Sequence, residues 1–241
     1  MDLPDDDFEP APPSPERTAA RALVLAAIAT RALDEPDAGE LRENDEPARQ
    51  RFLRWFNECG LRDEAEPQEL ELLEASFSGL EQKARVNASW RMEGAAVLAW
   101  ALGRAPLPSI LLQCDIDETL SAVGLLRPRE ETALAEPRLR AQEELDLCSS
   151  LYLTLHWRLR QFFLQPERMN FVEFAAQCDW AEMRLDGLQM IDNDVAVNGV
   201  PLTQVEQGRL RELHSIVQER RLALEWLAGF ESLYSDVTTD T

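Results

Sequence analysis

The sequence is poor in the residue types that most catalytic and metal sites use. Its 241 residues include two histidines and four cysteines, and no two cysteines form a Cys-x-x-Cys pair. It contains no Gly-rich phosphate loop, helical His-x-x-x-His pair, Ser-His-Asp arrangement or nucleophile elbow that we can identify. We therefore expect reduced core thiols, no disulfide framework, no bound metal and no cofactor.

The chain also lacks long apolar runs, and its basic residues are outnumbered by acidic ones. No apolar segment approaches the ~20 residues of a membrane-spanning helix, and we expect no signal peptide. The 24 basic and 45 acidic residues give a formal net charge of −21 at pH 7. Such a surface repels phosphate polyanions and anionic lipid. We expect a cytoplasmic protein that binds neither nucleic acid nor membrane and suits a basic protein partner, although such charge can also serve solubility alone.

Composition and periodicity divide the chain into a helical domain between two tails. Residues 1–14 are rich in aspartate and proline, which predicts a disordered acidic tail. Apolar spacing at helical period predicts one domain over 15–230, and 231–241 form a polar C-terminal tail. The predicted fold is mainly α, a single multi-helix bundle-like domain.

Caps and breakers place the helices along this domain. Ser14 followed by Pro15 is typical of a helix start, and Asp115 with Glu118 has the spacing of a capping box, which we favour over a metal-binding acidic cluster. The helices are expected at about 15–33, 47–60, 67–73, 81–102, after Asp115, 137–164, 170–185 and 203–230.

One short segment predicts β structure. Asn198 and Gly199 stand between the apolar-rich runs 194–197 and 200–202, and both residues tolerate positive φ. We therefore expect a small β-hairpin near residues 194–202, with Pro201 confining its strand to an edge.

The helix near 89–103 is the most apolar in the chain and carries a charge within its apolar face. Glu93 shares one side of that helix with Trp90, Val97 and Trp100. A helix this apolar belongs at the centre of a bundle, where a carboxylate needs a partner. The six tryptophans lie on predicted helices and are expected to fill the core.

Other helices also carry ionisable residues on or beside apolar stripes. Arg220 interrupts such a stripe in the last helix, where Glu219 lies on an adjoining face, and Asp146 and His156 belong to the helix over 137–164. Because an unpaired buried charge is costly, we expect Glu93 and Arg220 to form a hydrogen bond, with Asp146 or His156 completing the network.

This network has two interpretations. In the first it sets the register of the helices. In the second Glu93 and His156 are an acid and base pair in a pocket, and Arg91 or Arg220 binds an anionic substrate. The remaining candidate binding residues are Asp146, Glu219 and Trp157.

Several blocks of the chain resemble a known family when taken in order. They are SWRME at 89–93, WALG at 100–103, CDID at 114–117, LHWR at 155–158, DVAVNG at 194–199, ERRLALEWL at 219–227 and DVTTDT at 236–241. The chain resembles, over about residues 17–241, the bacterial family called domain of unknown function 4272. The resemblance implies a bacterial, mainly helical cytosolic protein and supplies no catalytic residues.

Three functional hypotheses follow from these features. The first is a non-enzymatic interaction protein, in concrete form an immunity or antitoxin protein that covers a basic toxin domain with an acidic face. The second is an enzyme that acts on a small anionic metabolite near Glu93, His156 and Arg220. The third is a scaffold or regulatory subunit whose acidic tail engages a larger complex.

Overall fold

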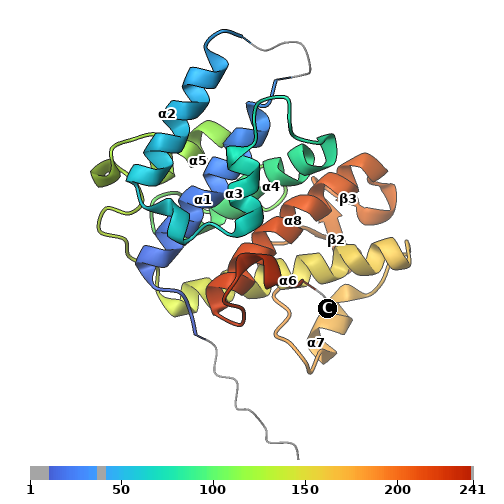
Figure 1. Ribbon diagram of the computed structural model, residues 1–241. Coiled ribbons are helices and arrows are strands. Elements are labelled where there is room, and N and C mark those ends of the chain that lie inside the picture. The colour runs from blue at the N-terminus through green and yellow to red at the C-terminus, as the bar shows by residue number, and fades with distance from the viewer. Residues whose placement is uncertain (1–10, 37–41, 240–241) are drawn as a thin grey trace, which may run out of the picture.

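The computed structural model describes residues 11–36 and 42–239 of the chain, and this part is mainly α-helical (Figure 1). Its α-helices are α1 (Pro15–Leu33), α2 (Asp45–Glu58), α3 (Pro67–Glu74), α4 (Gln82–Ala101), α5 (Ile116–Val123), α6 (Gln142–Leu164), α7 (Phe171–Gln177) and α8 (Gln207–Ala228). Short 3₁₀ turns lie at η1 (Leu61–Asp63), η2 (Arg129–Glu131), η3 (Leu202–Gln204) and η4 (Tyr234–Asp236). The strands are β1 (Met190–Ile191), β2 (Asp194–Val197) and β3 (Val200–Pro201).

The core is built on a chain of helix contacts. Helix α1 packs along α4, α4 along α8, and α8 along α6, so these helices run through the middle of Figure 1 while α2 and α7 lie at opposite edges. Every residue from Arg21 to Ala29 is buried, as expected of a helix with apolar residues all round. The predicted central position of α4 is therefore confirmed, and α1 shares it.

The helix starts follow the predicted caps. The Ser14 hydroxyl accepts a hydrogen bond from the Arg17 amide at 3.2 Å, and the Asp115 carboxylate accepts one from the Glu118 amide at 2.9 Å. Asp115 is thus a helix cap. Across the described residues no group of histidine, cysteine, aspartate and glutamate side chains is arranged to hold a metal ion.

The predicted hairpin is confirmed and gains a third strand. Strands β2 and β3 pair antiparallel, with Val197 opposite Val200, and the turn residues Asn198 and Gly199 have φ of 52° and 76°. Strand β1 pairs with the other edge of β2. The hairpin is anchored to α6, because Asp194 forms a salt bridge of 2.6 Å with Arg158.

Three predicted helix boundaries are wrong, two of them because tertiary hydrogen bonds use the backbone differently. The helix expected over 170–185 ends at Gln177, and the segment beyond it is held by the Arg184 amide, which donates to the Thr154 hydroxyl at 2.7 Å. Trp180 consequently lies 53% exposed instead of in the core.

The other two errors concern helix starts. The helix expected from 137 begins at Gln142, because the Arg140 amide caps α4 by donating to the Ala101 carbonyl at 2.8 Å. The helix expected from 203 begins at Gln207, after turn η3.

The C-terminal segment belongs to the folded body, although its polar composition predicted a tail. Tyr234 and Val237 are buried, and the Ser235 amide donates to Glu66 at 3.1 Å. One aromatic and one aliphatic side chain, buried among polar neighbours, are enough to anchor the C-terminal segment.

At the other end, residues 1–10 of the predicted acidic tail lie outside the described residues. The Ala11 amide donates to the Gly229 carbonyl at 3.0 Å. Among the described helices, none is both long and apolar enough to cross a bilayer.

Candidate functional site

The predicted contact between Glu93 and Arg220 is confirmed. The Arg220 Nε donates to Glu93 Oε2 at 2.8 Å, and the two side chains meet again at 2.7 Å through Arg220 Nη2. Both groups are buried, with side-chain exposures of 4% for Glu93 and 0% for Arg220. The pair joins α4 to α8 in the middle of the molecule.

The remaining partners of this pair are hydrogen-bonding groups of the protein itself. Arg220 Nη1 donates to the Ser109 carbonyl at 2.8 Å and to the Tyr152 hydroxyl at 2.9 Å, and Nη2 donates to the Leu112 carbonyl at 2.8 Å. Of the five N–H donors of the guanidinium, four are used by these three contacts and the Nε bond to Glu93, and Nη2 also lies 2.7 Å from the same Glu93 oxygen. The Cys114 amide donates to the second Glu93 oxygen at 3.0 Å. The network therefore pins the loop before α5, and Arg220 is committed to partners within the protein.

Two residues expected to complete the network lie elsewhere, so that part of the expectation is wrong. Asp146 is exposed and accepts a hydrogen bond from Gln142 at 2.8 Å. His156 is buried, and its Nδ1 lies 2.8 Å from Nη1 of Arg221. Because a guanidinium only donates, Nδ1 accepts this bond. Burial, and then the charge of Arg221, lower the pKa of His156 to about 3, so the ring is neutral at pH 7.

The other nominated binding residues occupy two separate places. Arg91 forms a salt bridge of 3.1 Å with Glu219, which joins α4 to α8 through two half-buried side chains. Burial raises the pKa of Glu219 even though Arg91 opposes this shift. Trp157 instead stacks on Phe174 with ring centroids 4.1 Å apart, so it packs α7 against α6.

Arg91 also lines a cavity of about 570 Å³ between α1, α3, α4 and η4, and we call this hollow the α3–α4 cavity. Four glutamates line it together with apolar side chains. The glutamates are Glu66, Glu69, Glu71 and Glu81, and the principal apolar residues are Ile28, Leu72, Leu80, Ala84 and Ala88. A hollow of this size with mixed lining is the usual form of a binding site.

Arg91 was expected to bind an anion beside Glu93 and His156, and it lies instead at this cavity, which neither of them lines; the glutamates of the cavity were missed. The sequence of α3 does contain a pattern that includes two of these glutamates, because Glu69 and Glu71 alternate with leucines. Such a short pattern is typical of any surface helix and does not indicate a binding site. What makes them a group is the fold, which packs α3 on α1 and sets it across the cavity from the start of α4.

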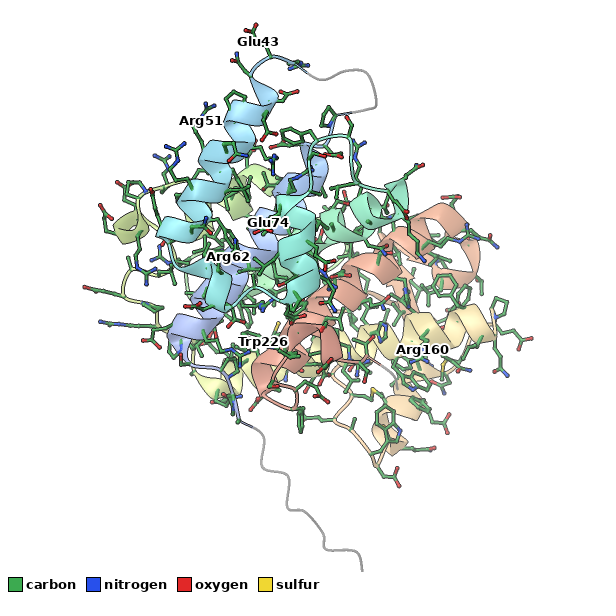
Figure 2. The ribbon with its side chains drawn as sticks, viewed as in Figure 1. Glu43, Arg51, Arg62, Glu74, Arg160 and Trp226 are labelled. Carbon is green, nitrogen blue, oxygen red and sulfur yellow. The ribbon has the colours of Figure 1, made fainter. Side chains whose placement is uncertain are left out.

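A second buried ion cluster was also missed. Arg21, on α1, binds Glu64 and Glu69, each at 2.9 Å. Burial raises the pKa of Glu69 against the opposing effect of Arg21. Arg21 also lies 6.0 Å from the ring of Trp226, a buried side chain in the last turn of α8 (Figure 2). An arginine inside the apolar run of α1 was the sequence signal for this cluster.

Cys114 and Cys148 are poor nucleophiles. Cys59 and Cys148 are buried, as the sequence predicts, whereas Cys114 and Cys178 are half-buried. Burial raises the pKa of both Cys114 and Cys148 to about 12, and a neutral thiol is a weak nucleophile.

The protein is thus mainly α-helical. Buried arginine–carboxylate pairs join its helices, and an acidic cavity lies at one side. The chain belongs to the family described as domain of unknown function DUF4272, whose model matches residues 3–172. This match ends before the last blocks on which the resemblance was based. No curated protein and no solved structure matches the chain.

Proposed function

We propose that the protein is a non-enzymatic interaction module that binds a basic protein through its acidic surface. The partition of charge in the fold is the observation that supports this. Most of the described carboxylates are exposed, whereas fewer than half of the arginines are. Arg21, Arg158 and Arg220 are 1% exposed or less, and each is bonded to an internal carboxylate. Part of the positive charge is thus paired with carboxylates inside the molecule, and the exposed residues carry more negative than positive charge.

The contacts of the nominated catalytic residues favour binding over catalysis. A general acid or base needs to reach its substrate and to titrate near the working pH. Both carboxylate oxygens of Glu93 are engaged, one by Arg220 and the other by the Cys114 amide, while His156 is held neutral against Arg221. The two residues contact different partners, so an enzyme based on this pair has little support.

The most concrete form of the proposal is an immunity or antitoxin protein of the bacterial cytoplasm that covers a basic toxin domain. Opposite charges on the two partners accelerate their encounter and guide its orientation. The same charge disfavours nucleic acid and anionic lipid as partners.

The test is to mix the purified protein with the toxin domain encoded beside its gene. We expect a complex by titration calorimetry, an association rate that falls steeply with added salt, and survival of cells that express both proteins. If no complex forms and the cells are not protected, the proposed role is overturned.

A matched variant separates this role from the enzyme hypothesis. His156→Asn keeps an acceptor in place of Nδ1 but removes the imidazole. Protection by this variant at the wild-type level supports a binding role, whereas loss of protection with intact folding and binding supports catalysis.

A further inference from the structure

The α3–α4 cavity differs from the rest of the acidic surface because its walls are apolar. Leu72 of α3 and Leu80 of the following loop are half-buried, and Ile28 of α1 and Ala88 of α4 are buried deeper inside. Its volume of about 570 Å³ exceeds the space of packing defects and is comparable with ligand sites. An apolar group that enters it would bury these walls and displace water.

The charges deep in this cavity are partly compensated. Glu69 binds Arg21 at 2.9 Å, and Glu66 accepts the Ser235 amide at 3.1 Å and lies 3.8 Å from Arg21. Arg91 is paired with Glu219 at 3.1 Å. Because Glu66 and Glu69 share one arginine, which also binds Glu64, a ligand meets a small negative charge at this depth.

The charges at the edge of the cavity are not compensated. Glu71 and Glu81 are exposed, and within the described residues neither carboxylate has a hydrogen-bond or ion-pair partner. The first turns of α4, including Ala84, are also exposed, so a partner can approach this edge. The cavity thus combines an apolar interior with two unpaired negative charges on its rim.

We infer that the α3–α4 cavity is the anchor site for the basic partner, and that it takes an apolar side chain flanked by arginine or lysine. The apolar side chain lies between Leu72, Leu80 and Ala84, and the flanking cations pair with Glu71 and Glu81. This inference rests on the proposed function and names the surface and partner chemistry through which it operates.

Charge complementarity decides between the possible occupants. A second copy of this chain also carries a net charge of −21, so it would bring like charge to a rim that is already negative. A purely basic segment would pair with the rim but leave the apolar walls in water. A segment with both properties satisfies both parts of the site.

The experiment uses synthetic amphipathic peptides as probes, with binding followed by fluorescence anisotropy at low salt. The first peptide contains leucine and arginine at helical spacing, the second replaces each leucine with serine, and the third replaces each arginine with glutamate. We expect the leucine–arginine peptide to bind about tenfold more tightly than the serine peptide, and the glutamate peptide not to bind.

Variants of the protein locate the binding. Ala84→Trp fills the cavity from an exposed position and is expected to weaken binding about tenfold, and Glu71→Gln with Glu81→Gln to weaken it about fivefold. The matched control is Glu143→Gln with Glu182→Gln, which removes the same charge from exposed positions outside the cavity and is expected to change affinity less than about twofold. Unchanged circular dichroism and urea midpoints confirm that each variant folds.

The outcomes separate this inference from the proposed function. If the control weakens binding as much as the rim variant, or the serine peptide binds equally well, attraction is diffuse; the anchor site is then overturned and the acidic interaction surface is retained. If Ala84→Trp and the rim variant both bind like wild type, the anchor site is likewise overturned. If no basic peptide and no neighbouring gene product binds, both proposals fail.

Discussion

At the residue scale, the core depends on the shape of arginine. The chain has a single lysine, Lys83, which is exposed, and the buried cations are all arginines. Arg220 shows why, because its planar fork reaches Glu93, Tyr152 and two backbone carbonyls together. A lysine ammonium has three donors on one atom and could not span these positions.

Breaking this network with Glu93→Gln should lower the free energy of unfolding by about 3–5 kcal/mol, because it leaves the Arg220 charge buried without its counterion. Urea denaturation at pH 7 measures the loss. The control is Glu74→Gln, which breaks the pair with Arg62 at 2.6 Å, whose side chains are 49% and 46% exposed (Figure 2). That change should cost less than about 1 kcal/mol. Equal losses in the two variants would contradict a structural role for Glu93.

His156 predicts a dependence of stability on pH. Its pKa is about 3 in the folded protein against an ordinary value of 6.5, so the unfolded chain binds a proton between these values and the folded one does not. The neutral ring therefore contributes fully to the free energy of unfolding above pH 6.5, and this contribution declines as the pH falls toward 3. The half-buried His214 acts in the same direction, because burial and Arg160 also lower its pKa.

Comparing wild type with His156→Asn isolates this contribution. Between pH 7 and pH 5 the wild type should lose about 2 kcal/mol more of its unfolding free energy than the variant does. Urea midpoints at the two pH values provide the measurement. Parallel losses in the two proteins would show that His156 takes up its proton without unfolding.

At the element scale, the position of α4 depends on a close approach at Gly94. A Cβ added there would lie 2.7 Å from the Tyr234 hydroxyl and 3.2 Å from Leu25 Cδ1. Glycine in a helix interior is less favourable than alanine by about 1 kcal/mol, so this glycine is explained by tertiary packing. The same hydroxyl is buried and has no hydrogen-bond partner within the described residues.

Gly94→Ala should therefore destabilise the protein by about 1–3 kcal/mol despite the better helix propensity of alanine. Tyr234→Phe removes an unpaired buried hydroxyl and should be neutral or stabilising by about 1 kcal/mol. Combined with Gly94→Ala, it should recover part of the loss, because the nearest atom is gone. Thermal unfolding of the four proteins gives the coupling, and strict additivity would refute the predicted contact.

At the scale of the whole molecule, charge opposes compactness. With a net charge of −21 at pH 7, the exposed carboxylates repel one another. The buried arginines pair with internal carboxylates and do not reduce this surface repulsion. The packing of the core must therefore offset it.

Screening should consequently stabilise the protein. Raising NaCl from about 0.02 M to about 0.3 M shortens the Debye length to less than the spacing of many surface charges, and we expect the melting temperature to rise by several degrees at pH 7. Near the isoelectric point of about 4.4 the same salt step should have little effect. A melting temperature that falls with salt at pH 7 would show that attractive surface pairs dominate instead.

Prediction from sequence succeeded where one local signal determined one local structure. Ser14 and Asp115 are helix caps, and Asn198 and Gly199 form the hairpin turn, because each depends on neighbours within a few residues. The contact of Glu93 with Arg220 could also be predicted, since two opposite charges within apolar stripes satisfy each other most economically.

The sequence by itself determined the fold class, the helix caps, the hairpin and the excess of acidic charge. Only the tertiary structure decided that Arg220 also binds Tyr152 and two backbone carbonyls, that His156 faces Arg221, and that Glu71 and Glu81 stand at the rim of one cavity. The physical reason is range: caps and turns depend on adjacent residues, whereas a side chain's partners and exposure depend on which distant helices pack beside it.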